Sequence, residues 1–460
     1  MKICVSDLYK CFGEQGLSLP DDFCFAKVVH DSRAVTKDSL FLAVKGPRFD
    51  GHDFIKQARA SGAKAILCEK RIDDQADQIV VPDVVQAMGQ MASYLRERIS
   101  KPVIAITGSS GKTTTKELLA HALSQVGKVN FTKGNLNNHL GVPLTVFDFD
   151  EDADFYIIEM GMSHFGEIEY LAKMVSPSHA LVTNVGHAHI ENLGGRLEGV
   201  AKAKGELFAC LGEDAIAFSF DDDPFIRTML TAAKRISYGF SGSCDFNACE
   251  VKVSEQGNEF CVCYGEEKVL IQQKLVGRHH VQNALVVYAI CNTLGVDDEN
   301  ILSALKSFEI HFNRGRRLDF DGHVLVDDSY NANPDSMRAA VSALVESFPQ
   351  RKKILVMGDM LELGDQAVTL HHEIGVFAKE LGIDALYAKG EISKNAVLGF
   401  WKDDKEFLKT HWDSDAKGLA QKIIRQEWQQ GTPLGLLVKG SRGSAMEKVI
   451  EALQAPERCG

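Results

Sequence analysis

The chain has 460 residues, of which 45% are hydrophobic and 25% charged, a composition typical of a globular protein with length for about three domains. Its net charge is −12, from 51 basic and 63 acidic residues, and without a lysine- or arginine-rich block we expect small-molecule partners and no nucleic acid. The start, MKICVSDLYKCFGEQG, lacks the apolar core of a signal peptide, and no run approaches the ~20 apolar residues of a spanning helix, so we expect a cytoplasmic protein without stable membrane insertion.

Residues 1–85 form the first predicted domain. Short strand candidates such as SLFLAVKG alternate here with turn-rich segments such as GPRFDGHDF. The section is too short and too rich in loops for a full α/β domain. We therefore predict a small accessory domain of mixed α/β structure.

Residues 86–311 form the second predicted domain, in which short apolar strands alternate with helical patterns. The strand candidates are PVIAITG, FYIIEMG, HALVTNVG and AIAFSF. Such alternation predicts a mostly parallel sheet covered by helices. The period-two stretch NACEVKVSEQGNEFCVCYGEEKVLIQQ predicts hairpins at the sheet edge, and RHHVQNALVVYAICNTLG predicts a helix that ends at Gly295.

Residues 312–460 form the third predicted domain, where the alternation starts again. The segments HVLVDDSY, KKILVMGD, DALYAKG and PLGLLVKGS read as strands, and a helical segment follows each of them. This pattern predicts a second, smaller α/β domain.

The cysteines carry little information about a site. There are eleven, an odd number scattered over a long chain, which indicates reduced thiols rather than a disulfide framework. Cys244 with Cys249 and Cys261 with Cys263 lack the spacing of paired zinc ligands, so we expect no zinc site there.

A phosphate loop is predicted in IAITGSSGKTTTKELLAHALSQVG, residues 104–127. A β-branched run reaches a glycine turn, after which apolar residues up to Val126 share one helical face. Backbone N–H groups and a helix N-terminus favour phosphate, Lys112 can reach terminal phosphates, and the Thr113 hydroxyl can bind Mg²⁺. Ile106 occupies the position of the first glycine in the longer form of the loop. The predicted nucleotide-binding residues are Gly108, Ser109, Ser110, Gly111, Lys112, Thr113 and Thr114.

Polar residues follow the next predicted strands. Glu159 ends the apolar run FYIIE, where a carboxylate is unusual and where open α/β sheets bind ligands, so it is a candidate Mg²⁺ ligand. His187 and His189 follow the next strand, and either could reach the same crevice. Two metal sites would suit phosphoryl transfer to an oxygen nucleophile. Lys202 and Lys204 fall on a predicted helix, where composition alone indicates solvated lysines.

The order of these motifs resembles that of the Mur ligases of peptidoglycan synthesis, and the resemblance covers essentially the whole chain. The motifs are TGSSGKTTTKE, TKGNLNNHLGVPLTV, IIEMGMSHFGEI, TNVGHAHIENLGG, AKAKGELF, GRHHVQNAL, RGRRLDFDGHVLVDDSYNANPDSM and MGDMLELG. The resemblance implies a role in building the cell wall, and so in cell shape and division. It also implies three domains: a UDP-substrate domain, a central ATPase domain and a C-terminal Rossmann-like domain.

Within the family, three segments resemble the member that joins D-alanyl-D-alanine to UDP-N-acetylmuramoyl-tripeptide. They are DSRAVTKDSLFLAVKGPRFDGHDF, DDSYNANPDSM and GDMLELG. The ligase that adds the third amino acid typically carries a DYAHTP-like segment where this chain has DSYNANP. The resemblance implies that ATP phosphorylates the tripeptide carboxylate and that the dipeptide amine attacks the acyl phosphate. Phosphorylation is chemically reasonable because a carboxylate lacks a good leaving group.

Roles in the phosphoryl-transfer site follow from the resemblance at matching positions. Lys112 and Thr113 match the phosphate-binding lysine and the hydroxyl ligand of a first Mg²⁺, whose carboxylate ligand is Glu159. His189, rather than His187, matches the histidine of a second Mg²⁺. Lys204 matches a lysine that is often carbamylated in this family, a change that would turn an ammonium into a carboxylate-like metal ligand.

The remaining implied contacts are with the nucleotide and the substrates. The nucleotide contacts are Asn283 near the adenine, Asp328, and either Arg316 or Arg317, with RLD favouring Arg317. The substrate contacts are Asn135 and Asn138 for the tripeptide, Asn331 and Asn333 for D-alanyl-D-alanine, and Ser32, Arg33, Lys45 and Arg48 for the uridine diphosphate end.

Because candidates fall on both the second and third domains, we expect the site to assemble when these domains close, in a protein that acts as a monomer. Alternatives in the same chemical class are a sister ligase that adds a single amino acid and a folylpolyglutamate-type ligase. An alternative outside the class is a nucleotide-switch binding protein, which would not need Glu159, His189 and Lys204 together.

Overall fold

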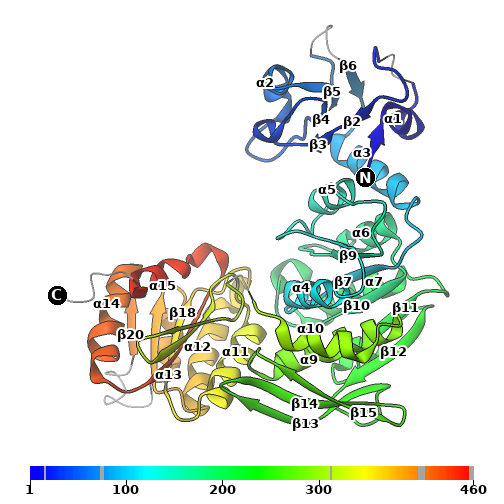
Figure 1. Ribbon diagram of the computed structural model, residues 1–460. Helices are drawn as coiled ribbons and strands as arrows, with labels where there is room; N and C mark the ends of the chain where they lie inside the picture. The colour runs from blue at the N-terminus through cyan, green and yellow to red at the C-terminus, as the bar shows by residue number, and fades with distance from the viewer. Residues whose placement is uncertain (15–16, 73–76, 311–312, 402–409, 455–460) are drawn as a thin grey trace.

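A computed structural model describes residues 1–14, 17–72, 77–310, 313–401 and 410–454. Figure 1 shows three α/β units: the N-terminal unit, in blue, packs on the central unit, and the C-terminal unit, in yellow, orange and red, lies beside the central one. The predicted α/β class with three units is thus confirmed. The predicted boundary at residues 311–312 and Cys459 lie outside the described residues, and the exact domain limits stay a prediction.

The N-terminal unit contains a parallel sheet of order β3-β4-β5-β6 and a separate antiparallel pair, β1 and β2. Helix α3 leads out of this unit, and its buried face shares one hydrophobic cluster with α5, α6 and α7 of the central unit. The elements are β1 (Ile3–Cys4), α1 (Val5–Phe12), β2 (Cys24–Phe25), β3 (Lys27–Val29), β4 (Ser39–Leu42), α2 (Ile55–Ala60), β5 (Ala63–Cys68), β6 (Asp77–Val80) and α3 (Val84–Arg96).

The central unit is built on a nine-stranded sheet of order β15-β14-β13-β12-β11-β10-β7-β9-β8. Its strands from β12 to β8 pair in parallel, and β13, β14 and β15 form the predicted antiparallel hairpins at one edge. Strand residues alternate between two hydrophobic clusters, one against α5, α6 and α7 and the other against α4, α9 and α10. Each face of the sheet is therefore covered by helices, as the sequence predicts.

The first half of the central unit carries the phosphate loop and consists of β7 (Val103–Thr107), α4 (Lys112–Leu123), β8 (Val129–Phe131), α5 (Gly141–Phe147), β9 (Phe155–Glu159), α6 (Glu167–Val175), β10 (His179–Val182) and α7 (Leu197–Ala209). The second half consists of β11 (Ile216–Phe220), α8 (Pro224–Arg227), β12 (Lys234–Gly239), β13 (Phe246–Ser254), β14 (Gly257–Tyr264), β15 (Glu267–Gln273), α9 (Arg278–Thr293) and α10 (Asp298–Ser307). The prediction that Val126 belongs to the buried face of α4 is wrong: the helix ends at Leu123, and Val126 is 43% exposed in the following turn.

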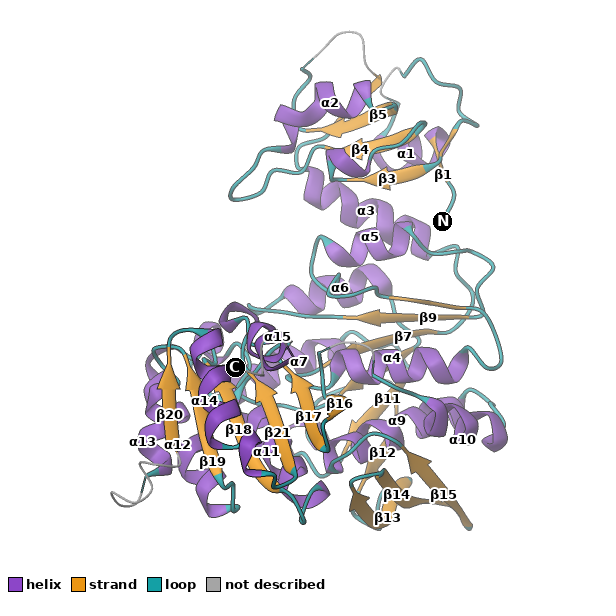
Figure 2. Cartoon of the chain, turned by 60° about the vertical axis from the view of Figure 1, so that its left-hand side comes forward, coloured by secondary structure: helices purple, strands orange, loops and turns teal. Residues whose placement is uncertain are grey.

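The described residues of the C-terminal unit form a six-stranded sheet of order β16-β17-β21-β18-β19-β20, in which β16 pairs antiparallel with β17 and the other pairs are parallel. Helices α11, α12 and α13 cover one face and α14 and α15 the other, as Figure 2 shows. The elements are β16 (Arg316–Phe320), β17 (His323–Asp328), α11 (Pro334–Ser347), β18 (Lys352–Gly358), α12 (Ala367–Glu380), β19 (Ala385–Lys389), α13 (Lys394–Phe400), β20 (Thr410–Asp413), α14 (Ala416–Gln426), β21 (Leu434–Lys439) and α15 (Glu447–Gln454).

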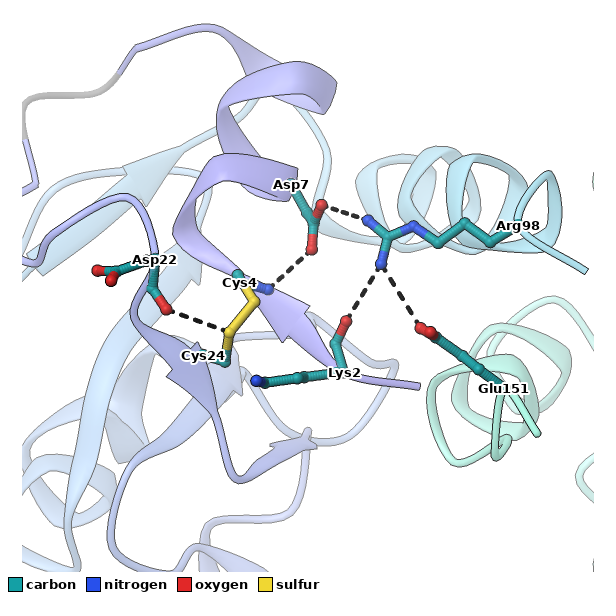
Figure 3. The surroundings of a disulfide bond; sticks show 7 residues. All are labelled: Lys2, Cys4, Asp7, Asp22, Cys24, Arg98 and Glu151. Atoms are coloured by element: carbon teal, nitrogen blue, oxygen red, sulfur yellow. Dashed lines mark hydrogen bonds and ion pairs between the residues drawn. A yellow bond between two sulfur atoms is a disulfide. The ribbon is translucent and has the colours of Figure 1, made fainter.

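A disulfide between Cys4 and Cys24 corrects the expectation that all the thiols are reduced. The two cysteines face each other in the antiparallel register of β1 and β2, which brings their side chains together although twenty residues separate them. Figure 3 shows that the bond lies next to Asp7, which pairs with Arg98, and that Arg98 also reaches Glu151 of the central unit.

In the described ranges, the helices are all too short or too polar to cross a membrane.

Candidate active site

A cavity of about 440 Å³ lies between the central and C-terminal units, a size suited to a small-molecule ligand. The central unit contributes the phosphate loop, the end of β9 and the start of α9, and the C-terminal unit contributes the ends of β17 and β21 and the start of α11. The predicted residues that line it are Ser109, Ser110, Gly111, Lys112, Thr113, Thr114, Asn135, Asn138, Glu159, His189, Asn283, Asp328, Asn331 and Asn333.

Two glycines shape the phosphate loop between β7 and α4. Gly108 has φ 151°, and a Cβ at this position would lie 1.8 Å from the Thr183 hydroxyl oxygen. Gly111 has φ 78° and precedes the first residue of α4, so it turns the chain into the helix without the strain of a side chain. The loop therefore needs glycine at both positions, although Gly108 itself does not line the cavity.

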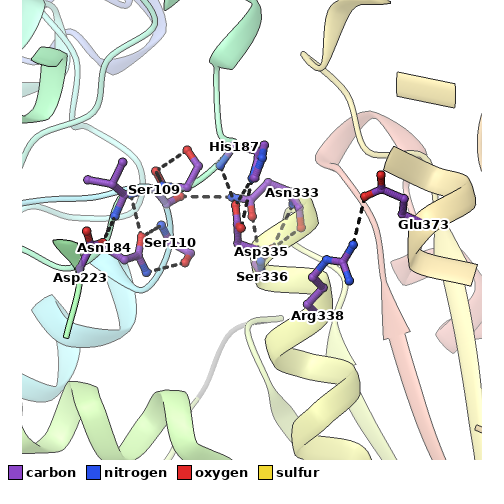
Figure 4. Close-up of polar contacts among 12 residues, drawn as sticks. Ser109, Ser110, Asn184, His187, Asp223, Asn333, Asp335, Ser336, Arg338 and Glu373 are labelled. Atoms are coloured by element: carbon purple, nitrogen blue, oxygen red, sulfur yellow. Dashed lines mark hydrogen bonds and ion pairs between the residues drawn. The ribbon is translucent and has the colours of Figure 1, made fainter. Parts of the chain in front are cut away.

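Asn184, two residues after the end of the neighbouring strand β10, holds the loop. Its side-chain oxygen accepts hydrogen bonds from the backbone amides of Ser109, at 3.1 Å, and Ser110, at 2.9 Å (Figure 4). Its amide nitrogen donates to the Ser110 hydroxyl at 2.8 Å. Because these two backbone amides already have a partner, the amides at the start of α4 are the ones left to face a phosphate. Asn184 was not predicted from the sequence, although a polar residue just beyond a buried strand is a detectable signal.

Lys112 is the first residue of α4, and its ammonium group donates to the Gly108 carbonyl at 2.7 Å. Burial lowers the pKa of this lysine, while the nearby Glu159 carboxylate opposes that shift. The ammonium group is thus held beside the loop, where a terminal phosphate would replace a neutral carbonyl as its partner.

Glu159 ends β9 and is 1% exposed. A buried carboxylate needs a compensating charge, and Lys116 provides one: its ammonium nitrogen lies 3.6 Å from Glu159 Oε2 and 3.1 Å from Glu117 Oε1. Lys116 is itself fully buried on α4, one turn after Lys112. Lys116 was not predicted as a site residue, because it looks like an ordinary helix lysine in the motif GKTTTKE.

The two candidate histidines have different surroundings. His189 lines the cavity, and its Nδ1 lies 2.7 Å from the Glu362 carboxylate of the C-terminal unit, which leaves Nε2 for another partner. His187 Nδ1 instead lies 2.9 Å from Asp335 Oδ2 on α11, and its backbone amide donates to the same oxygen at 2.6 Å (Figure 4). The structure therefore brings His189 rather than His187 into the cavity.

Lys204 is buried on α7, only 2% exposed, so the expectation from composition of a solvated surface lysine is wrong. Burial and the neighbouring Lys112 ammonium both lower its pKa well below the ordinary value. Lys202, two residues earlier, is exposed and lies over the Phe165 ring. Lys204 does not line the cavity itself, but a neutral amine next to Lys112 is the form that reacts with carbon dioxide.

The C-terminal unit supplies an ion pair and a stacked cation to the cavity. Asp328, at the end of β17, pairs with the Lys439 ammonium of β21 at 2.5 Å. The Arg314 guanidinium lies 3.8 Å from the centre of the Tyr330 ring. Lys439, Arg314 and Tyr330 all line the cavity and were not predicted, because their contacts depend on which strands and loops of the C-terminal unit lie side by side.

Comparison with known proteins identifies the family to which the three units belong. Three family profiles match in chain order: "Mur ligase family, catalytic domain" over residues 25–96, "Mur ligase middle domain" over 106–291 and "Mur ligase, glutamate ligase domain" over 313–442. A relative from Escherichia coli (strain K12), "UDP-N-acetylmuramoyl-tripeptide--D-alanyl-D-alanine ligase", is 38% identical over 447 residues, covering 95% of this chain and 96% of the relative. The chain belongs to the Mur ligase family.

Solved Mur ligase structures have the same three-unit architecture. A crystal structure of MurF from Acinetobacter baumannii superposes with a TM-score of 0.91 at 32% identity, covering 98% of this chain and 99% of that one. A crystal structure of MurF ligase from Thermotoga maritima in complex with ADP gives a TM-score of 0.83 at 27% identity, covering 93% and 96%.

Two predicted nucleotide contacts of this Mur ligase, Arg316 and Arg317, lie away from the cavity, whereas Asn331 and Asn333 line it. Arg317 on β16 pairs with Glu255 and Asp319, and Arg316 is exposed on the same strand, so neither lines the cavity in this arrangement. Asn333 caps α11 by accepting from the Ser336 amide, and its side-chain nitrogen lies 3.4 Å from the Ser109 carbonyl. The nucleotide role of either arginine and the D-alanyl-D-alanine role of Asn331 and Asn333 stay predictions.

The four residues predicted for the uridine diphosphate end lie in the N-terminal unit. Ser32 and Arg33 follow β3, and Lys45 and Arg48 follow β4, so both segments lie at the same edge of a parallel sheet. The exposed Arg33 is held by Asp31, whose pKa this contact lowers to about 2. Their substrate role stays a prediction.

The Mur ligase cavity suits Mg²⁺ bound together with a nucleotide. Glu159 Oε2 is buried and has no hydrogen-bond partner among the described residues, although it lies near Lys116. Over the same residues, no group of three or more histidine, cysteine, aspartate or glutamate side chains could hold a metal alone. Mg²⁺ commonly takes one or two carboxylates and completes its shell with phosphate oxygens and water, so this donor set fits the ion.

Lys116→Met should destabilise the central unit because it leaves the buried carboxylate of Glu159 without its counter-charge. Breaking a buried pair costs about 3 kcal/mol, which lowers the melting temperature of a domain of this size by roughly 6–12 °C. Mg²⁺ with a non-hydrolysable ATP analogue should raise the melting temperature more in the variant than in the wild type, because the metal supplies the missing positive charge. Lys128→Met is the control, since Lys128 pairs with Asp150 on the surface. An unchanged melting temperature for Lys116→Met would contradict this role.

A polar contact also fixes the hairpin of β13 and β14 against the C-terminal unit. Glu255, at the hairpin turn, accepts hydrogen bonds from Arg351 at 2.7 and 3.2 Å and from Arg317 at 3.3 Å. The hydrogen bonds from Arg351 lower the pKa of Glu255. The contact is therefore fully present at pH values above the ordinary carboxyl pKa, and it is lost as the pH falls through the lowered pKa.

Glu255→Gln should loosen the C-terminal unit and increase the radius of gyration measured by small-angle X-ray scattering. An ATP analogue with UDP-tripeptide should compact both the wild type and the variant, because the predicted contacts of these ligands come from both units. Glu259→Gln is the matched control, as this residue pairs with Lys252 within the hairpins. Failure of the ligands to compact the wild type would count against domain closure.

Proposed function

We propose that the protein is an ATP-dependent amide ligase that joins D-alanyl-D-alanine to UDP-N-acetylmuramoyl-tripeptide and releases ADP and phosphate. The observation that carries the reaction type is the single cavity in which a phosphate loop, the buried carboxylate of Glu159 and the Asp328–Lys439 pair meet. The substrates are supported by the 38% identical relative, whose name states them, and by its coverage of nearly the whole chain.

The reaction proceeds in two steps. A carboxylate oxygen of the tripeptide attacks the γ-phosphorus of ATP, the bond to the β-phosphate oxygen breaks, and ADP leaves. The amine nitrogen of D-alanyl-D-alanine then attacks the acyl carbon, loses a proton and expels inorganic phosphate. Lys112 and the amides at the start of α4 bind the phosphoryl oxygens, where negative charge builds up.

In this proposal, two Mg²⁺ ions would be held by Thr113, Glu159, His189 and a carbamylated Lys204. When bound, the ions neutralise charge on the transferred phosphate. Glu159 is supported by its Oε2, which has no hydrogen-bond partner in the described residues, and Lys204 by burial beside a second ammonium, which lowers its pKa and favours the neutral amine. Glu362 orients His189, since it holds the Nδ1 side of the ring.

Mass spectrometry of the product tests the substrate assignment. With UDP-tripeptide and ATP, D-alanyl-D-alanine should give the UDP-linked pentapeptide, whereas single amino acids, glutamate among them, should give no product. A product with a single amino acid would favour a sister ligase, and glutamate addition to a folate would favour a folylpolyglutamate-type ligase. ATP turnover that requires neither the tripeptide carboxylate nor the dipeptide amine would favour a nucleotide-switch binding protein.

A further inference from the structure

Asn137 connects a predicted substrate loop to the buried carboxylate of Glu159. The loop, residues 132–140, runs between β8 and α5, and its exposed residues Asn135 and Asn138 line the cavity. Asn137 lines the cavity as well, and its amide nitrogen donates to Glu159 Oε1 at 2.7 Å. One short loop thus carries both the predicted tripeptide contacts and a direct bond to the predicted metal ligand.

The backbone around Asn137 is shaped for this contact. Its carbonyl accepts a 2.7 Å hydrogen bond from the Gly161 amide, two residues after Glu159. A Cβ at position 161 would lie 2.9 Å from Asn137 Oδ1, closer than real side chains pack, so glycine leaves the space that Asn137 occupies. The loop is therefore anchored to the end of β9 by main chain and side chain together.

The bond from Asn137 also decides which oxygen of Glu159 is available. Oε1 is occupied by the amide, whereas Oε2 is buried without a hydrogen bond in the described part of the chain and faces the Lys116 ammonium. Lys116 also donates to the Gly134 carbonyl at 3.4 Å, so the loop has a second link to the same carboxylate. A shift of the loop must therefore move or release Glu159.

We propose that Asn137 is a positioning residue that couples binding of the tripeptide to binding of the metal–nucleotide. The inference rests on the proposed function, because it takes Glu159 as a metal ligand and the loop as a tripeptide contact. When the tripeptide binds to the loop, Asn137 holds Oε1 of Glu159 and leaves Oε2 available to the metal. By thermodynamic linkage, the metal–nucleotide then also tightens the binding of the tripeptide.

Binding of Mn²⁺, followed by electron paramagnetic resonance, tests this coupling without turnover. In the wild type with a non-hydrolysable ATP analogue, UDP-tripeptide should tighten Mn²⁺ binding by about five-fold or more. Asn137→Ala should weaken Mn²⁺ binding about ten-fold and remove the effect of the tripeptide. Asn130→Ala is the matched control, because the Asn130 side chain donates to the Asp150 carbonyl away from the cavity.

A second variant keeps the inference testable if Asn137→Ala folds poorly. Gly161→Ala displaces Asn137 while keeping its amide, and it should show the same loss of coupling. Unchanged Mn²⁺ affinity and intact coupling in either folded variant would overturn the inference. Pentapeptide formation by the wild type is a separate result, so failure of the coupling and failure of the proposed function are distinguishable.

Discussion

Lys204→Ala should reduce ligase activity to background, and excess bicarbonate should not restore it. In the proposed mechanism, the buried amine beside Lys112 becomes a metal-binding carbamate only by reaction with carbon dioxide, and alanine has no amine to react. Loss of a metal ligand from a phosphoryl-transfer site removes the charge neutralisation on which the reaction depends, so we expect a decrease of more than about a hundred-fold.

The control for this variant is Lys202→Ala, which removes an exposed lysine from the same helix and should keep normal activity. Carbon-13 NMR gives an independent check: wild-type enzyme in labelled bicarbonate should show a carbamate signal that Lys204→Ala lacks. Near-normal turnover of Lys204→Ala would eliminate the carbamate from the mechanism.

Lys112→Met should lower kcat/KM for ATP by about a hundred- to a thousand-fold, the usual effect of removing one charged group that stabilises a transition state. The ammonium group lies at the start of α4 beside the phosphate loop, and methionine retains its length without its charge. The steady-state rate of phosphate release at varied ATP concentration measures the effect.

Stability should change little in Lys112→Met, because the hydrogen bond that it loses is to a backbone carbonyl, unlike the buried ion pair of Lys116. Comparing the melting temperatures of Lys112→Met and Lys116→Met therefore distinguishes a loss of catalysis from a loss of stability. Activity of Lys112→Met within about three-fold of the wild type would show that another cation carries the phosphate contact.

Much of the fold could be predicted from periodicity. The strands that end at Thr107, Glu159 and Val182 are continuous apolar runs, as expected for parallel strands buried on both faces. The phosphate loop was predictable because its glycines and lysine are contiguous in the sequence. The end of α4 was not, since Val126 continues the apolar pattern although the chain has already turned.

Residues whose role depends on tertiary contacts could not be found in this way. Lys116 and Lys204 look like ordinary helix lysines, and only packing shows that both are buried. Asn184 and Asn137 act through bonds to distant segments, at the phosphate loop and Glu159 respectively. The disulfide depends on the register of two short strands, which cysteine spacing does not report.

Phosphate release is the most direct measurement of the central claim, that this cavity transfers phosphate from ATP to a carboxylate that an amine then captures. The enzyme should release phosphate rapidly with ATP, UDP-tripeptide and D-alanyl-D-alanine, and omission of either the tripeptide or the dipeptide should reduce release to background. Equal release without D-alanyl-D-alanine, or without the tripeptide, would contradict the account.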